Sequence, residues 1–141
     1  GGLVIYGRSD ATLNPGGVRI GTAELYRQIE GFPEVVEAIA TAWRFEGDEK
    51  IVLFVRLRDG SEWTDALDQA MRDRLRRNCS PRHVPTWIVS VADLPRTISG
   101  KLSEIAVRNA ISGQEIGNEG ALANPQALDF FRRWQPSGQL P

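Results

Sequence analysis

Two apolar segments separated by a short turn constrain the fold most strongly. Residues 35–45 mix Val, Ile, Ala and Trp, and residues 50–57 are rich in Val, Ile and Phe. By period alone the first segment could be a strand or a helix, but Gly47 and Asp48 between the two favour an antiparallel strand pair. We therefore expect the rest of the chain to supply helices that pack on this sheet.

The other periodic segments predict a third strand and three helices. Helices are predicted over 22–29, with Thr22 as the N-cap, over 64–77, where arginines cluster towards the C-terminal end, and over 103–111. Strands are predicted over 86–91 and, more briefly, over 3–6, before a turn at 14–17. The expected class is α+β: a small, mostly antiparallel sheet of about three strands packed with helices, plus an N-terminal hairpin or hinge.

Composition indicates one ordinary globular domain. The 141 residues are 41% hydrophobic and 25% charged with a net charge of −1, so we expect no nucleic-acid or membrane partner. The apolar run over 51–55 is far shorter than the roughly 20 residues of a membrane helix. A single cysteine, Cys79, excludes an internal disulfide and fits a cytoplasmic location. Without an initiating Met or a signal segment, the chain is expected to continue upstream.

The end of the chain differs in composition from the rest. From residue 113 onwards Gly, Asn, Gln and Pro become frequent, and one amphipathic segment covers 125–134. This segment has too little apolar surface to fold alone. We therefore divide the chain into a domain over 1–112 and a C-terminal extension over 113–141 that packs on the domain.

The loop from Leu94 to Lys101 is the first candidate site. Pro95 and Gly100 shape a tight turn with one ammonium group at its tip. Lys50 and Lys101 are the only lysines among the 17 basic residues, and a compact charge on a flexible stem suits contact with a buried phosphate or carboxylate. A solvated surface lysine is the alternative. A phosphate-binding P-loop is excluded, because that motif needs Gly at position 95 and Ser or Thr at position 102.

A second candidate site lies near the N-terminus. Arg8 and Arg19 flank a turn in which Asp10 can accept backbone hydrogen bonds. Gly16 and Gly17 would let a ligand come close to the main chain. A glycine-rich hairpin with surface arginines is the alternative interpretation.

Taken together, the two segments resemble the C-terminal domain of the adenylate-forming superfamily, which includes acyl-CoA synthetases, firefly luciferases and peptide-synthetase adenylation domains. There a strand ends in Gly-Arg-x-Asp, followed by Gly-x-Arg-Ile or Leu and a helix with Glu; the chain has these at 7–10, 17–20 and Glu24. The superfamily loop Leu-Pro-x-Thr-x-Ser-Gly-Lys is matched at every fixed position by 94–101. Ala11 replaces the second Asp often seen after the hinge Asp, and Val18 stands where the acetate-activating members commonly have His. The tail over 120–131 is similar to that of members that take acetoacetate.

The resemblance implies an acid–CoA ligase that works with an N-terminal adenylate-binding domain of the same chain, so that this piece alone would be inactive. A small carboxylic acid and ATP would give an acyl-adenylate and diphosphate, and coenzyme A would then take the acyl group as AMP leaves. Mg²⁺ would bind mainly to the other domain, and we expect no metal site here. The implied roles are catalysis for Lys101, ATP or AMP binding for Arg8 and Lys101, the hinge for Asp10, and coenzyme A binding for Gly16, Gly17, Arg19 and Arg76.

Two alternatives to an acetoacetate ligase stay open. One is a ligase for another short-chain acid such as acetate or propionate, and the other is a non-catalytic binding module of the same fold. The sole histidine, His83, follows Pro81 in a loop. Its spacing from the serines, Cys79 and other possible ligands does not indicate a catalytic or metal site. We therefore expect structural roles for His83 and Cys79.

Overall fold

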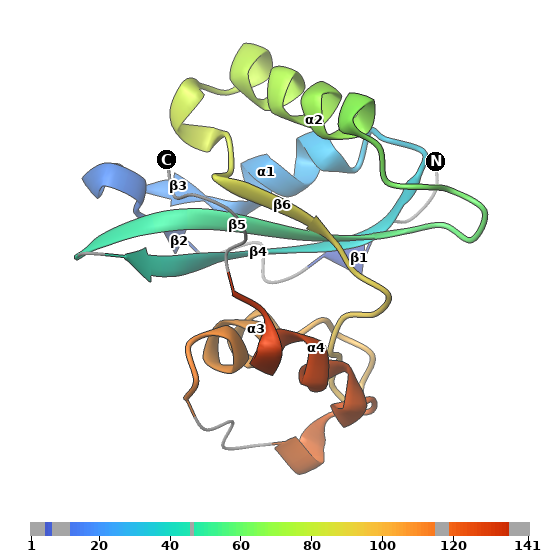
Figure 1. Ribbon diagram of the computed structural model, residues 1–141. Coiled ribbons are helices and arrows are strands. Elements are labelled where there is room, and N and C mark those ends of the chain that lie inside the picture. The colour runs from blue at the N-terminus through green and yellow to red at the C-terminus, as the bar shows by residue number, and fades with distance from the viewer. Residues whose placement is uncertain (1–4, 7–11, 46, 115–118, 136–141) are drawn as a thin grey trace.

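A four-stranded sheet forms the centre of the computed structural model, which describes residues 5–6, 12–45, 47–114 and 119–135 (Figure 1). The strands are β1 (Ile5–Tyr6), β4 (Val35–Phe45), β5 (Asp48–Leu57) and β6 (Trp87–Ser90), in the order β1-β4-β5-β6. The long pair β4 and β5 is antiparallel, with a register that runs from Val35 opposite Leu57 to Phe45 opposite Asp48. The expected hairpin is therefore confirmed.

The α+β class is confirmed as well, but the sheet differs in detail from the expected one. The brief strand predicted over 3–6 is present as β1 and joins the sheet as a fourth strand. The two outer pairs, β1 with β4 and β5 with β6, are parallel, so by its strand pairs the sheet is not mostly antiparallel. A helix lies between the two strands of each parallel pair along the chain, α1 before β4 and α2 before β6. Such a crossover returns the chain in the same direction, which a local sequence pattern does not reveal.

Helices cover both faces of the sheet (Figure 1). The helices α1 (Thr22–Ile29) and α2 (Asp65–Asn78) pack on one face, and α3 (Glu104–Ile111) and α4 (Leu128–Arg133) pack on the other. Alternate residues of β5 enter the two clusters: Leu53 and Val55 face α1 and α2, whereas Val52 and Phe54 face α3 and α4. Burial on both faces explains why residues 51–55 of this strand are all apolar.

Two helices begin at polar caps. The Thr64 hydroxyl accepts from the Leu67 N–H at 3.1 Å at the start of α2, and the Ser103 hydroxyl accepts from the Ala106 N–H at 3.2 Å at the start of α3. The prediction of Thr22 as a cap is wrong. Gly21 holds the cap position, and Thr22 is buried in the first turn of α1. The reason is that β3 (Ile20–Gly21), which pairs with β2 (Thr12–Leu13), runs directly into the helix.

The end of the described chain packs on the sheet. Short 3-10 turns, η3 (Glu119–Ala121) and η4 (Pro125–Ala127), lead into α4. Leu128 and Phe131 of α4 are fully buried in the cluster under β5. Within the described ranges, none of the helices combines the length and apolar character needed to cross a membrane.

Candidate functional site

The loop over residues 94–102 is held by its own backbone hydrogen bonds. The Thr97 N–H donates to the Lys101 carbonyl and the Gly100 N–H donates to the Thr97 carbonyl, both at 2.8 Å. Gly100 has a φ of +93°, in the left-handed region that favours glycine. The hydroxyls of Thr97 and Ser99 lie 2.8 Å apart. The result is a closed turn with a defined tip.

Lys101 directly follows this turn and is exposed. Ile98 within the turn is 73% exposed, whereas Leu94 and Leu102 at the two ends of the loop are buried. Among the residues that the structure describes, Lys101 has no ion-pair partner. The loop therefore exposes the Lys101 ammonium group, without a neutralising partner among the described residues, next to a hydrogen-bonded turn.

Charged groups connect the base of this loop to the sheet. Glu37 on β4 is buried and accepts from the guanidinium of Arg96 at 2.6 Å and from that of Arg56 at 2.7 Å. The hydrogen bond to Glu37 raises the pKa of Arg96. Burial raises the pKa of Asp93, but hydrogen bonds from the Asn124 amide and the Leu94 N–H outweigh it and hold that pKa below its usual value. Asp93 and Arg96 are therefore both charged at neutral pH.

The glycine turn is η1 (Pro15–Gly17), between β2 and β3. Gly16 and Gly17 are exposed and have φ values of +59° and +83°. Asp48, at the end of the β4–β5 hairpin, accepts from the Gly16 N–H at 3.1 Å. Beside it, Glu49 accepts from the Asn14 N–H at 2.9 Å. The turn is thus fixed to the hairpin while its outer surface stays open.

The arginines expected to meet coenzyme A are on the surface. Arg19 and Arg76 are exposed, and Arg76 pairs with Asp73 at 3.1 Å. The guanidinium of Arg82 lies against Gly16, with Nη1 2.5 Å from the point that a Cβ on Gly16 would occupy. Arg8 and Asp10 lie outside the described residues. Arg82 is an additional cation at the glycine turn that sequence reasoning missed, since nothing in the spacing separates it from the other arginines.

The lysine loop and the glycine turn belong to opposite layers of the domain. Leu94 and Leu102, which flank Lys101, pack in the cluster with α3 and α4. Leu13 and Ile20, which flank the glycine turn, pack in the cluster with α1 and α2. The structure therefore does not bring the two predicted sites together, but presents them from different sides of the sheet.

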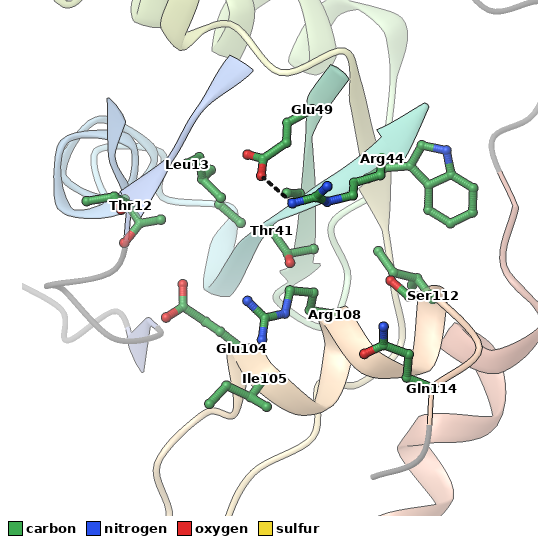
Figure 2. A pocket seen from close by; sticks show the side chains of 15 residues that line it. Thr12, Leu13, Thr41, Arg44, Glu49, Glu104, Ile105, Arg108, Ser112 and Gln114 are labelled. Carbon is green, nitrogen blue, oxygen red and sulfur yellow. Dashed lines mark ion pairs between the residues drawn. The ribbon is translucent and has the colours of Figure 1, made fainter. Parts of the chain in front are cut away.

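A cleft of about 930 Å³ lies between α3 and the strands β2, β4 and β5 (Figure 2). Its walls carry both signs of charge, with Glu49 and Glu104 beside Arg44 and Arg108, and Arg44 pairs with Glu49 at 3.9 Å. A polyphosphate would meet carboxylates as well as guanidinium groups here. The mixed charge thus offers no clear preference for an anion.

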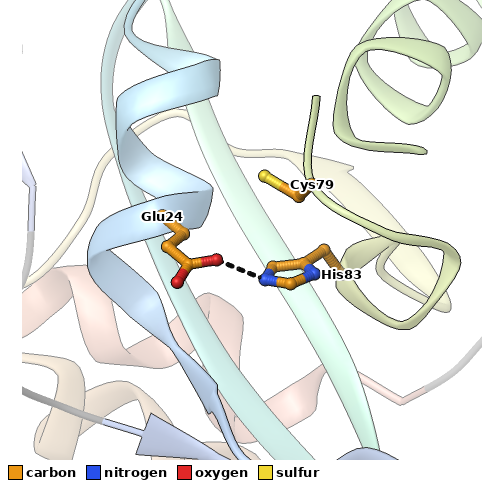
Figure 3. Close-up of side chains that lie close together, drawn as sticks. All are labelled: Glu24, Cys79 and His83. Carbon is orange, nitrogen blue, oxygen red and sulfur yellow. Dashed lines mark hydrogen bonds and ion pairs between the residues drawn. The ribbon is translucent and has the colours of Figure 1, made fainter. Parts of the chain in front are cut away.

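Glu24, Cys79 and His83 lie close together where α1 meets η2 (Pro81–His83), as Figure 3 shows. His83 Nε2 is 2.6 Å from a Glu24 oxygen, and His83 Nδ1 is 2.7 Å from the Ser80 hydroxyl. Burial, followed by the nearby Glu24 carboxylate, raises the pKa of Cys79. Both ring nitrogens are occupied and the thiol is kept protonated, so the cluster joins α1 to η2 and gives neither a ready nucleophile nor a ready metal ligand.

Comparison with known proteins identifies the family of this domain. Residues 28–101 match the family model described as AMP-binding enzyme C-terminal domain. The chain is 57% identical over 131 residues to an acetoacetyl-coenzyme A synthetase of Rhizobium meliloti and 44% identical over 133 residues to one of Xenopus tropicalis. These alignments cover 93% and 94% of this chain but 20% of each relative. The chain thus spans about a fifth of the length of these curated relatives.

Solved structures give the same result for the fold. An acetoacetyl-CoA synthetase from Streptomyces lividans superimposes with a TM-score of 0.76 and 35% identity, over 89% of this chain and 19% of that one. An acyl-CoA synthetase from Brucella canis gives a TM-score of 0.68 and 29% identity, over 78% of this chain and 21% of that one. The described domain has the fold found in about a fifth of each of these longer chains.

Proposed function

Because the chain belongs to the family of AMP-binding enzyme C-terminal domains, we propose that it is the mobile C-terminal domain of an ATP-dependent acid–CoA ligase whose acid is acetoacetate. The domain over 1–112 would carry the function, and the extension over 113–141 would pack on it. The observation that carries the proposal is the closed turn that exposes Lys101 without an ionic partner among the described residues. The names of the relatives support the choice of acid.

In the first half-reaction, an oxygen of the acid's carboxylate attacks the α-phosphorus of ATP, and diphosphate leaves with the electrons of the broken P–O bond. Lys101 would lie between the carboxylate and the α-phosphate and stabilise the charge that builds there. Arg8 would contact the nucleotide. Glu37 and Asp93, at the base of the loop, are already engaged with Arg96. Mg²⁺, which accompanies ATP, would therefore find its ligands mainly on the N-terminal domain.

In the second half-reaction, the sulfur of coenzyme A attacks the acyl carbon and AMP leaves with the electrons of the broken C–O bond. The domain would rotate about Asp10, withdraw Lys101 and bring Gly16 and Gly17 against the pantetheine arm. Arg19 and Arg76 would contact phosphates of coenzyme A. The positions of the two sites in opposite layers support this proposal, because one orientation of the domain would not present both.

The test is ATP–diphosphate exchange by the full-length protein with acetoacetate, acetate, propionate and 3-hydroxybutyrate. We expect acetoacetate to give the fastest exchange and Lys101→Ala to abolish it. Lys50→Ala is the matched control, because it removes the chain's other lysine, which pairs with Asp48 at 3.8 Å. Fastest exchange with another acid would overturn the substrate, and an active Lys101→Ala enzyme would overturn the mechanism.

A further inference from the structure

The C-terminal segment over 121–124 runs along the lysine loop. The Ile98 N–H donates to the Ala121 carbonyl at 3.0 Å, and the Ala123 N–H donates to the Arg96 carbonyl at 2.8 Å. Thr97 and Leu122 form an antiparallel bridge. On the other side, Arg96 forms an antiparallel bridge with Leu102. The start of the lysine turn therefore lies between the chain that follows Lys101 and the C-terminal segment.

Asn124 completes this contact with its side chain. Its amide oxygen accepts from the Arg96 N–H at 2.9 Å. Its amide nitrogen donates to the Leu94 carbonyl at 2.8 Å and to the Asp93 carboxylate at 2.9 Å. The oxygen and both hydrogens of one amide are thus used on three residues at the base of the loop.

The position of Asn124 is itself fixed. Asn124 is 9% exposed, and the apolar residues on either side of it, Leu122 and Leu128, are 8% and 0% exposed. Both belong to the cluster under β5, as does Phe131. The segment that carries Asn124 is therefore anchored in the core by its own apolar side chains.

The tip of the lysine loop has no such anchor of its own. Ile98, Ser99, Gly100 and Lys101 are all exposed. Their place depends on the backbone hydrogen bonds of the turn and on the residues at its base. Contacts at that base thus decide where the Lys101 ammonium lies relative to the sheet.

We propose that Asn124 is a positioning residue for Lys101, through which the C-terminal segment sets the geometry of the adenylation step. This inference rests on the proposed function. It assigns the segment after residue 119 a part in the reaction and not only in stability. A loss of alignment of about 1 Å can cost on the order of 100-fold in rate. A loosened loop base would therefore slow the step that needs Lys101 and leave the step that does not.

The experiment compares variants of the full-length protein in the two half-reactions. Asn124→Ala removes all three side-chain hydrogen bonds, and Asn124→Asp keeps the size and the acceptor but removes both donated bonds. Gln126→Ala is the matched control, since it deletes an exposed amide two residues later. ATP–diphosphate exchange measures the first step, and thioester formation from supplied acyl-adenylate and coenzyme A measures the second.

We expect both Asn124 variants to lower exchange by about 10- to 100-fold, while thioester formation and the Gln126→Ala enzyme stay unchanged. Hydrogen exchange should become faster in a peptide over 96–102 and remain slow in β5. Equal loss of both half-reactions would overturn the inference, because it would indicate a structural role alone. Unchanged ATP–diphosphate exchange in both Asn124 variants would overturn it too.

Lys101→Ala separates the two proposals. If it abolishes exchange while the Asn124 variants retain it, the inference about Asn124 fails and the proposed function stands. If Lys101→Ala itself leaves exchange intact, the proposed function fails and the inference fails with it. Where Asn124→Ala gives insoluble protein, the size-conserving Asn124→Asp carries the same test.

Discussion

The ring of Phe131 meets the ring of Phe54 edge-on, with the centroids 4.9 Å apart and the planes at 89°. Phe54 is in the middle of β5, whereas Phe131 belongs to the last helix, and both are fully buried. Trp134 also packs edge-on against Phe54, at 5.4 Å. The extension is thus part of the hydrophobic core, although its composition differs from the rest of the chain.

Phe131→Ala should destabilise the fold strongly. Removal of a fully buried phenylalanine costs about 3–5 kcal/mol, since it loses apolar contact and leaves a cavity. Phe130→Ala is the matched control: Phe130 is adjacent but 42% exposed, so its loss should cost less than about 1 kcal/mol. Urea unfolding of the 141-residue chain measures both. Equal values for the two variants would contradict the packing of α4 described above.

Tyr26→Phe should lower the free energy of unfolding by about 1–3 kcal/mol. The Tyr26 hydroxyl donates to the Glu104 carboxylate and accepts from the Ala40 N–H at 2.9 Å. It therefore connects α1, β4 and α3, and its removal leaves two buried groups without this partner. Thermal or urea unfolding at pH 7 checks the loss. A variant as stable as the parent would mean that water or other groups replace the hydroxyl.

The same residue predicts a dependence on alkaline pH. Burial, and then the charge of Glu104, raise the pKa of Tyr26 above its usual value. The unfolded chain releases this proton near pH 10 while the folded chain keeps it, so stability should fall as the pH rises above about 10. Tyr26→Phe should make this fall less steep. An unchanged slope in unfolding experiments between pH 9 and 11 would contradict the assignment.

The elements that were predicted correctly from the sequence are those whose boundaries depend on residues within a few positions of one another. The long helix α2 begins at Thr64 and the hairpin turns at Gly47, because a cap and a turn each depend on local backbone geometry. The lysine turn belongs to this group as well, with Gly100 at positive φ.

The features that were missed depend on distant partners. Asn124 contacts Leu94 across 30 residues, and Arg96 contacts Glu37 across 59 residues. A polar residue in a strand or a tail gives no indication of which distant group it meets. The parallel pairing of β1 with β4 and of β6 with β5 was missed for the same reason, since the direction of a strand is decided by the crossover that precedes it and not by the strand's own sequence.

Cys79 should react slowly with alkylating reagents. Its pKa is raised by burial and then by Glu24, so less thiolate is present at neutral pH than for a free thiol with a pKa of about 8.5. Iodoacetamide labelling at pH 7.5, compared with N-acetylcysteine, measures the difference. Glu24→Gln should speed the reaction because it removes the negative charge near the thiol. Glu30→Gln is the control, because it removes an exposed glutamate at the C-terminal end of the same helix. Faster labelling than the free thiol would refute the raised pKa.

Gly17→Ala should separate backbone strain from ligand contact. Gly17 has a φ of +83° with open space around the position of a Cβ, and Gly60 has a φ of +88° with equally open space. Alanine at either position therefore carries a similar strain of about 1–2 kcal/mol. If the glycine turn meets pantetheine, only Gly17→Ala should slow thioester formation by the full-length protein. Equal effects of the two variants would leave the turn with a purely structural role.

Asp10→Pro should affect the two half-reactions in the opposite way to Lys101→Ala. Proline fixes φ near −65° and would prevent the backbone rotation that the second conformation needs. We expect the full-length Asp10→Pro protein to keep ATP–diphosphate exchange and to lose thioester formation from supplied acyl-adenylate. Asp10→Ala keeps the torsional freedom and should show a much smaller loss. Loss of exchange together with thioester formation in Asp10→Pro would argue against a hinge at this residue, because a hinge variant arrested in the adenylating conformation must still place Lys101 at the α-phosphate.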